Sequence, residues 1–353
     1  MTIATHRSSE RHPADRGLQF GRAQSRAVAN TVAVYQRMLR EDRGLGPSDV
    51  GERGREAAAR IHAFRPALAE EIEGIASGAG QAPDVLFAIN ARTELLAGGL
   101  VAGTAGECST VAVLDRQRAS GVLVQNWDFH PDLAASRVLW TVDDGDERRF
   151  TTFTEAGILA KIGSNAHGVA LAINFLATDL DGGLDGVPVH VLCRAVLEEA
   201  RTVGEARELI AGSPVSASVC MTVAGPDGPD GATGVAACAL ERWPGGTEEQ
   251  ATGPDRPWVA HTNHFIDPIA ARDTLADGPS GPSTHGRMDQ LVATLEDAPA
   301  LDGTQIAELL GSRGRPGVAP IFQTDDPTLP WLERCATLAT VGLEVPSGRL
   351  WLV

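Results

Sequence analysis

Two residue types that could do covalent chemistry together stand 20 positions apart in this sequence. Cys108 opens an apolar run that extends to Leu114, and a turn-prone segment separates it from a second alternating run that begins at Val122. The pattern is typical of a β-hairpin. If Leu114 faces Val122, antiparallel pairing places Cys108 opposite Asp128. The sequence therefore predicts that a thiol and a carboxylate meet at the open end of the hairpin.

The residues around this pair occur in motifs that extend through most of the chain. They are Asn90-Ala-Arg-Thr-Glu94, Glu107-Cys-Ser-Thr110, Gln125-Asn-Trp-Asp-Phe129, Thr154-Glu-Ala-Gly-Ile-Leu-Ala-Lys-Ile-Gly-Ser-Asn165, Gly168-Val-Ala-Leu-Ala-Ile-Asn174 and His261-Thr-Asn-His-Phe265. Together they resemble the acyl-coenzyme A:6-aminopenicillanic acid acyltransferase family, whose members are N-terminal-nucleophile (Ntn) hydrolases that cut themselves before the cysteine. The resemblance implies a four-layer αββα sandwich. It also implies one domain, 17–353, cleaved into a helical segment 17–107 and a segment 108–353 that carries the nucleophile.

The chemistry of Cys108 agrees with that resemblance, although a lone cysteine before an apolar run is usually a small buried hydrophobe. In the uncut chain the thiol can attack the carbonyl carbon of Glu107, giving a thioester that water hydrolyses. The new α-amine has an ordinary pKa of about 7.7–8.0, so it can act as the base for its own thiol. The family resemblance predicts glycine before the nucleophile, whereas this chain has Glu107, a bulkier charged residue that we expect to slow cleavage.

Two further catalytic residues are predicted. Asp128 could orient the terminal amine or assist the acyl shift; the alternative is a turn-capping aspartate. The resemblance makes Asn263 the donor to the tetrahedral oxyanion, a contribution of about 3–4 kcal/mol to lowering the barrier; the alternative is a structural loop residue. His261 and His264 lack the spacing and further ligands of a zinc site. We expect neither metal nor cofactor, with an acyl-coenzyme A as a candidate co-substrate.

Other charged residues have weaker signals. Lys161 is the single lysine of a chain with 30 basic residues, and it could bind a carboxylate or phosphate or be structural. Arg92 and Glu94 could act near the cleavage site or form a helical ion pair. Arg287, Arg313 and Arg315 are candidate binders of anionic groups. Asn165, His167 and Asn174 match family positions without a role that the residues themselves reveal.

Hydrophobic periodicity predicts an α+β fold with antiparallel sheets. Helices are expected at 18–39, 57–75, 83–96, 189–211 and 286–311. Strands are expected at 108–114, 121–126, 137–142, 150–153, 157–163, 168–175, 217–224, 233–240, 257–261, 335–342 and 348–353. Residues 1–16 are polar and without periodicity, so they are expected to be disordered.

Composition limits the classes of partner. The chain has 353 residues, 43% of them hydrophobic, and a net charge of −16, which argues against nucleic acid and against an anionic membrane surface. Apolar runs are too short to span a membrane. A polar N-terminus and five cysteines without a disulfide-like spacing predict a cytoplasmic protein.

The leading hypothesis is a self-processing N-terminal-cysteine acyltransferase or amidohydrolase. It would form an acyl-cysteine thioester and pass the acyl group to an amine or to water, with small-molecule substrates as partners and the two cleaved segments remaining associated. Transfer to an amine requires a pocket that excludes water, and the sequence leaves the substrate-binding residues unidentified. The alternative is an uncut, non-catalytic scaffold or binding protein of the same fold, in which Glu107 blocks processing.

Overall fold

Two β-sheets form the centre of the protein in a computed structural model that describes residues 3–97, 99, 108–145, 149–228, 234–278, 281–314 and 317–353. Within these residues the larger sheet has the order β1 (Ala4–Ser8), β4 (Arg137–Asp143), β5 (Arg149–Glu155), β6 (Ile162–Asn165), β7 (Ala170–Phe175), β8 (Val219–Pro226), β9 (Val235–Trp243) and β10 (Gly246–Ala251). The smaller has the order β11 (Trp258–His261), β2 (Ser109–Asp115), β3 (Ser120–Phe129), β12 (Ala336–Val345) and β13 (Leu350–Leu352). Neighbouring strands are antiparallel except for the parallel pair of β1 and β4.

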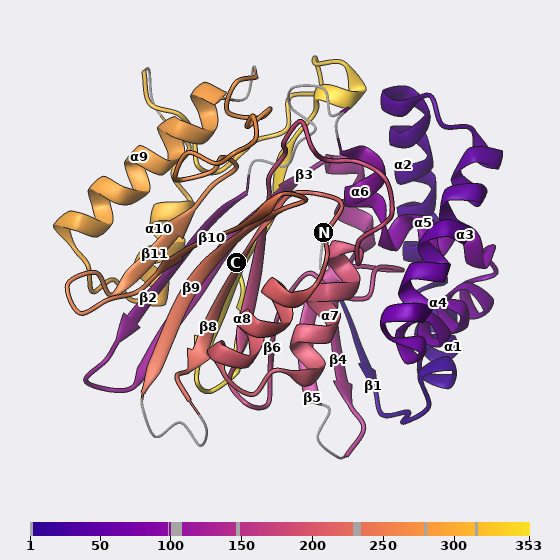
Figure 1. Cartoon of the computed structure of the whole chain (residues 1–353), viewed down its shortest axis with the longest axis horizontal. Coiled ribbons are helices and arrows are strands. Elements are labelled where there is room, and N and C mark those ends of the chain that lie inside the picture. The colour runs from indigo at the N-terminus through magenta and orange to yellow at the C-terminus, as the bar shows by residue number, and fades with distance from the viewer. Residues whose placement is uncertain are drawn as a thin grey trace.

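The sheets pack face to face between two layers of helices (Figure 1). The side-chain amide of Gln125 on β3 exchanges hydrogen bonds with the main chain of Ile173 on β7, across the space between the sheets. Helices α7 (Val189–Glu199) and α8 (Val203–Gly212) contact the larger sheet. Helices α9 (Gly281–Asp297) and α10 (Gly303–Leu310) contact the smaller one. The expected α+β fold and its four-layer αββα arrangement are confirmed.

A group of N-terminal helices lies at the flank of the sandwich, drawn in indigo and violet in Figure 1. These helices are α1 (Pro13–Ala23), α2 (Ser25–Arg43), α3 (Pro47–Phe64), α4 (Pro66–Ala79), α5 (Pro83–Asn90) and α6 (Arg92–Leu96). Each single helix expected from periodicity is divided in two. Pro66 explains one division, because the residue before a proline is driven out of helical geometry; Arg65 has φ −149° and ψ 95°.

The expectation that residues 1–16 are disordered is wrong for the described residues 3–16. Ala4–Ser8 form an edge strand paired with β4, and α1 begins at Pro13. The polar character that suggested disorder has a structural cause: Arg16 is buried and donates from Nη2 to Glu71 Oε2 at 2.6 Å. Helices α1 and α4 also cross closely, since a Cβ atom at Gly17 would lie 2.1 Å from the carbonyl oxygen of Glu71.

The central hairpin forms as predicted, but its register differs by one residue. Leu114 pairs with Gly121 rather than with Val122, and Ser109 pairs with Asn126. A loop of this length tolerates such a shift. Continuing the register places Trp127, and not Asp128, opposite Cys108.

The ordered N-terminus generates a stability prediction. Glu71 is fully buried between Arg16 and Arg194, whose Nη2 lies 2.8 Å from Glu71 Oε2. Removing one partner of a buried ion pair leaves charge uncompensated, so Arg16→Met should lower the free energy of unfolding by about 3 kcal/mol. Arg22→Met, at an exposed position of the same helix, should change it by less than about 0.5 kcal/mol. Urea denaturation checks both variants, and equal stabilities would contradict the prediction.

Candidate active site

Cys108 immediately precedes β2 and lines a small, largely apolar cavity of about 40 Å³. Trp127, Phe129 and Phe175 contribute aromatic walls, and Lys161 is one of its basic residues. The thiol is buried and lies 4.0 Å from the main-chain oxygen of its β3 neighbour, Asp128. Burial raises the pKa of the Cys108 thiol to about 11, and the negative charge of Asp128 adds to the shift. The thiol therefore needs a base to become a nucleophile.

The main-chain carbonyl of Cys108 is held from two sides. Asn174 on β7 donates from Nδ2 at 3.1 Å, and Arg287 on α9 donates from Nη1 at 2.8 Å. The same guanidinium donates to Ser109 Oγ at 2.9 Å and, through Nη2, to Asn263 Oδ1 at 3.1 Å. Arg287 is only 1% exposed, so one buried cation joins the nucleophile's own main chain to the predicted oxyanion donor.

Asn263 follows β11 and is positioned by bonds to its main-chain N–H and to both ends of its side-chain amide. Its main-chain N–H donates to Thr284 Oγ1 at 2.8 Å, and its Nδ2 donates to the carbonyl of Phe175 at 2.9 Å. An amide nitrogen carries two hydrogens, and the Phe175 contact uses one. The other hydrogen is left for a further acceptor, and the oxyanion role of Asn263 stays a prediction.

Asp128 lies on the other face of β3 from Trp127 and Phe129, because successive side chains of a strand alternate. It is fully buried and pairs with Thr337 of β12. The thiol lies 4.0 Å from the main-chain oxygen of Asp128, and the negative charge of the Asp128 carboxylate also acts on the thiol, so the catalytic role of that carboxylate stays a prediction. Glu107, the other side of the predicted cleavage site, lies outside the described residues, as does Arg315.

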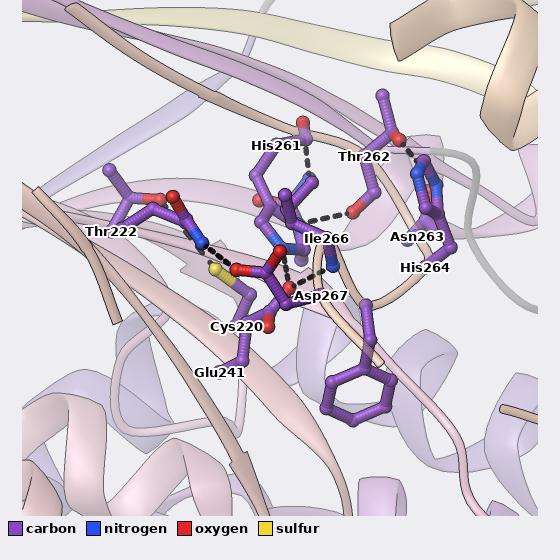
Figure 2. A network of polar contacts seen from close by, with 12 residues as sticks. Cys220, Thr222, Glu241, His261, Thr262, Asn263, His264, Ile266 and Asp267 are labelled. Carbon is purple, nitrogen blue, oxygen red and sulfur yellow. Dashed lines mark hydrogen bonds and ion pairs between the residues drawn. The ribbon is translucent and has the colours of Figure 1, made fainter. Parts of the chain in front are cut away.

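A buried ion pair supports the same region from the larger sheet (Figure 2). His261 Nε2 lies 2.8 Å from Glu241 Oε1 on β9, and His261 Nδ1 lies 2.8 Å from the carbonyl of Thr262. An acceptor therefore faces each ring nitrogen, which favours the imidazolium. Burial acts to lower the pKa of His261, but Cys220 and Glu241 outweigh it and hold that pKa well above its ordinary value. The carbonyl of His261 accepts from Asn174 Nδ2 at 3.3 Å, so this pair fixes the strand end that precedes Asn263.

The sequence did not indicate Glu241 or its ion pair with His261. There, His261 was considered only as a metal ligand, and that interpretation was rejected. A glutamate at the end of an apolar strand run was the available signal.

His264 contacts Thr262 Oγ1 and Thr284 Oγ1, and burial lowers its pKa to about 3. Within the described part of the chain no group of three or more His, Cys, Asp or Glu side chains could hold a metal ion.

Lys161 belongs to a second buried cluster, on the cavity wall beside Cys108. Its Nζ forms an ion pair with Glu155 and lies 3.6 Å from the centroid of the Trp127 ring. Tyr35 donates its hydroxyl hydrogen to Glu155, and Arg92 Nε lies 4.0 Å from Glu155 Oε1. Burial lowers the pKa of Lys161 to about 7 against the attraction of Glu155. Lys161 is thus not the surface charge that its residue type would suggest.

A larger cavity of about 740 Å³ shares Phe175 with the cavity at Cys108. Glu94 lines it and is 3% exposed. Its Oε1 accepts from the main-chain N–H of Val189 at 2.8 Å, while its Oε2 has no hydrogen-bond partner among the described residues. Burial raises the pKa of Glu94 to about 7, and Asp181, which lines the same cavity, adds to the shift. Sequence reasoning predicted no substrate space, and this cavity is the candidate.

Comparison with known proteins gives the family of the chain. A model of the acyl-coenzyme A:6-aminopenicillanic acid acyl-transferase family matches residues 115–317, which is more than half of the chain, and the chain belongs to that family. It is similar to the acyl-coenzyme A:6-aminopenicillanic-acid-acyltransferase 40 kDa form of Emericella nidulans, with 27% identity over 305 residues, 86% of this chain and 79% of the relative. A solved structure, penicillin V acylase from Agrobacterium tumefaciens, matches 67% of this chain and 79% of its own with 12% identity and a TM-score of 0.38.

Membership in this family supports the general conclusion that the protein is an enzyme that transfers acyl groups. Among the described helices, none combines the length and the hydropathy that a membrane span requires.

The His261–Glu241 pair generates a pH prediction. A histidine whose pKa is raised by folding stabilises the fold fully below its unfolded pKa of about 6.5, and this contribution is lost as pH rises through the folded pKa. Glu241→Gln should therefore be less stable than the wild type by about 3–5 kcal/mol at pH 6, and the difference should shrink at alkaline pH. Glu248→Gln, at an exposed position of β10, serves as the control. Urea denaturation from pH 6 to 10 measures this; a difference independent of pH would count against a charged His261.

Proposed function

We propose that the protein is a self-processing N-terminal-cysteine acyltransferase or amidohydrolase in which Cys108 carries the acyl group. The observation that supports it most directly is the guanidinium of Arg287, which binds the carbonyl of Cys108 at 2.8 Å and Asn263 Oδ1 at 3.1 Å. It keeps a nucleophile and an amide donor together in a buried site. Membership in an acyl-transferase family agrees with this chemistry.

Cleavage before Cys108 would leave the nucleophile in place. Chain termini normally fray, but the carbonyl of Cys108 is bound by Asn174 and Arg287, and these bonds do not depend on the preceding peptide. The freed α-amine then stays beside its own thiol and can take the thiol proton. The thiolate attacks the acyl carbonyl, Asn263 donates to the oxyanion, and the leaving group departs to give the acyl-Cys108 thioester.

The two cavities suggest which part of a substrate each of them binds. The space at Cys108 is small and largely apolar, which suits a short acyl chain or the reacting end of a longer one and limits the access of water. The larger cavity carries Glu94, Asp181 and exposed arginines such as Arg272, which suits a polar acyl donor or an amine acceptor. An acyl-coenzyme A is a candidate donor, since the fungal relative is named for one. Transfer to water or to an amine proceeds from the same thioester.

Self-cleavage is tested by intact mass. Purified wild-type protein should consist of fragments 1–107 and 108–353, because attack by Cys108 on Glu107 breaks the peptide bond between them. Cys108→Ala should remain a folded, uncut and inactive chain. Cys238→Ala, which removes another buried thiol from β9, should be cut like the wild type. A single full-length species in active wild-type preparations would exclude self-processing, whereas an uncut and inactive wild-type chain would favour the non-catalytic binding protein.

The oxyanion role of Asn263 is tested by kinetics on the cut protein. Asn263→Ala should lower the rate constant by roughly 10²–10³ with substrate affinity nearly unchanged, because the donor meets charge that exists only in the tetrahedral state. Cleavage should slow as well, since it passes through its own oxyanion. Asn30→Ala on α2, which bonds to the 3-10 turn Pro131–Ser136, should leave the rate constant unchanged. Wild-type turnover in a matured Asn263→Ala variant would make Asn263 structural.

A further inference from the structure

Self-cleavage needs a base that turnover does not. In the mature protein the α-amine of Cys108 can accept the thiol proton. Before cleavage the same nitrogen is part of the peptide bond, and an amide nitrogen does not accept protons near neutral pH. The thiol is buried and its pKa is raised to about 11, so another group must take its proton first.

The cavity at Cys108 offers two basic side chains, Arg92 and Lys161. Arginine stays protonated in proteins and cannot act as a base. Asp128 lies on the opposite face of β3 from the cavity wall. Lys161 places Nζ 3.6 Å from the centroid of the Trp127 ring, and Trp127 is the cross-strand neighbour of Cys108 when the hairpin register is continued.

The surroundings of Lys161 suit proton exchange. Glu155 binds its Nζ, and Tyr35 in turn donates to Glu155. Cys108 lines the same cavity as Lys161 and acts electrostatically on it, and the Nζ of Lys161 lies over the ring of Trp127. The titratable and charged groups that act on this cluster come from α2, α6, α7, β5 and the start of β2, and they are Tyr35, Arg92, His190, Cys193, Glu155 and Cys108.

We propose that Lys161 is the general base, and then the general acid, of cleavage before Cys108; this inference rests on the proposed self-processing. The neutral amine takes the thiol proton, and the thiolate forms a C–S bond to the carbonyl carbon of Glu107. As the C–N bond breaks, the ammonium of Lys161 returns the proton to the departing nitrogen of Cys108. Water then hydrolyses the thioester, leaving a carboxylate on Glu107 and the free thiol, so Lys161 ends as it began.

Two features of the cluster agree with this role. The pKa of Lys161 is lowered to about 7 by burial, so a large fraction of it is neutral at physiological pH. Tyr35 and Arg92 come from the part of the chain before the cleavage site, whereas Glu155 and Lys161 come from the part after it. The base is therefore assembled only when both parts have folded together, which would prevent cleavage of an incompletely folded chain.

The test follows the cleavage of freshly synthesised full-length chain by intact mass in a cell-free system. Lys161→Arg keeps a positive charge and a donor to Glu155 but cannot lose a proton, and Lys161→Gln removes the charge. Both should be cut at least 10²-fold more slowly than the wild type. Added methylamine should restore cleavage of Lys161→Ala in proportion to its concentration. In the wild type the cleavage rate should rise with pH through about 7 and then level off, because the neutral amine is the active form.

The controls separate this inference from the self-processing on which it rests. An uncut wild-type chain would refute self-processing itself. A wild-type chain that is cut, together with a Lys161→Arg variant cut at the same rate, would reduce Lys161 to a structural charge. Cleavage of Lys161→Gln at the wild-type rate would also overturn the proposal. If the variants fail to fold by circular dichroism, the wild-type pH profile decides: a rate that does not rise through neutral pH excludes Lys161 as the base.

Discussion

The buried guanidinium of Arg287 is the contact on which the site depends. A fully buried cation is costly unless its hydrogens are satisfied, and this one is bonded to the carbonyl of Cys108, to Ser109 Oγ and to Asn263 Oδ1. The donors are fixed in one plane, so the three partners are fixed relative to each other. Helix α9 must therefore pack on the smaller sheet in one orientation before Cys108 and the amide of Asn263 can lie side by side.

Other buried charges act in the same way between other layers. Glu71 joins α4 to α1 and α7 through Arg16 and Arg194, and His261 joins the smaller sheet to Glu241 in the larger one. Such pairs contribute less to stability than apolar residues of similar volume would, but each is satisfied in one geometry only. The apolar core supplies the stability, and these pairs select the arrangement of layers in which the catalytic residues meet.

How far the sequence predicted the structure depended on whether the determining contacts were local. Most strands from 108 onward were found because alternating runs bounded by Gly and Asp are local signals, but β10 (Gly246–Ala251) was missed. Helix divisions were missed where periodicity continues across a break, although Pro66 was a visible signal. Cys108 and Asn263 were identified from motifs, and they do converge. Glu241 was not found because its partner, His261, is brought to it only by the packing of two sheets. Arg287 was a candidate for anion binding, whereas the structure shows it donating to the main-chain carbonyl of Cys108.

Phe175 links features that would otherwise be independent. It lines both the small cavity at Cys108 and the larger cavity at Glu94, and its carbonyl accepts from the amide of Asn263. The side chain helps to shape the two cavities, whereas the main chain holds the amide that we propose as the oxyanion donor. Selection on this position could therefore widen or narrow the range of accepted acyl groups by changing the side chain alone. The catalytic geometry would be inherited unchanged, because every residue type at this position supplies the same carbonyl.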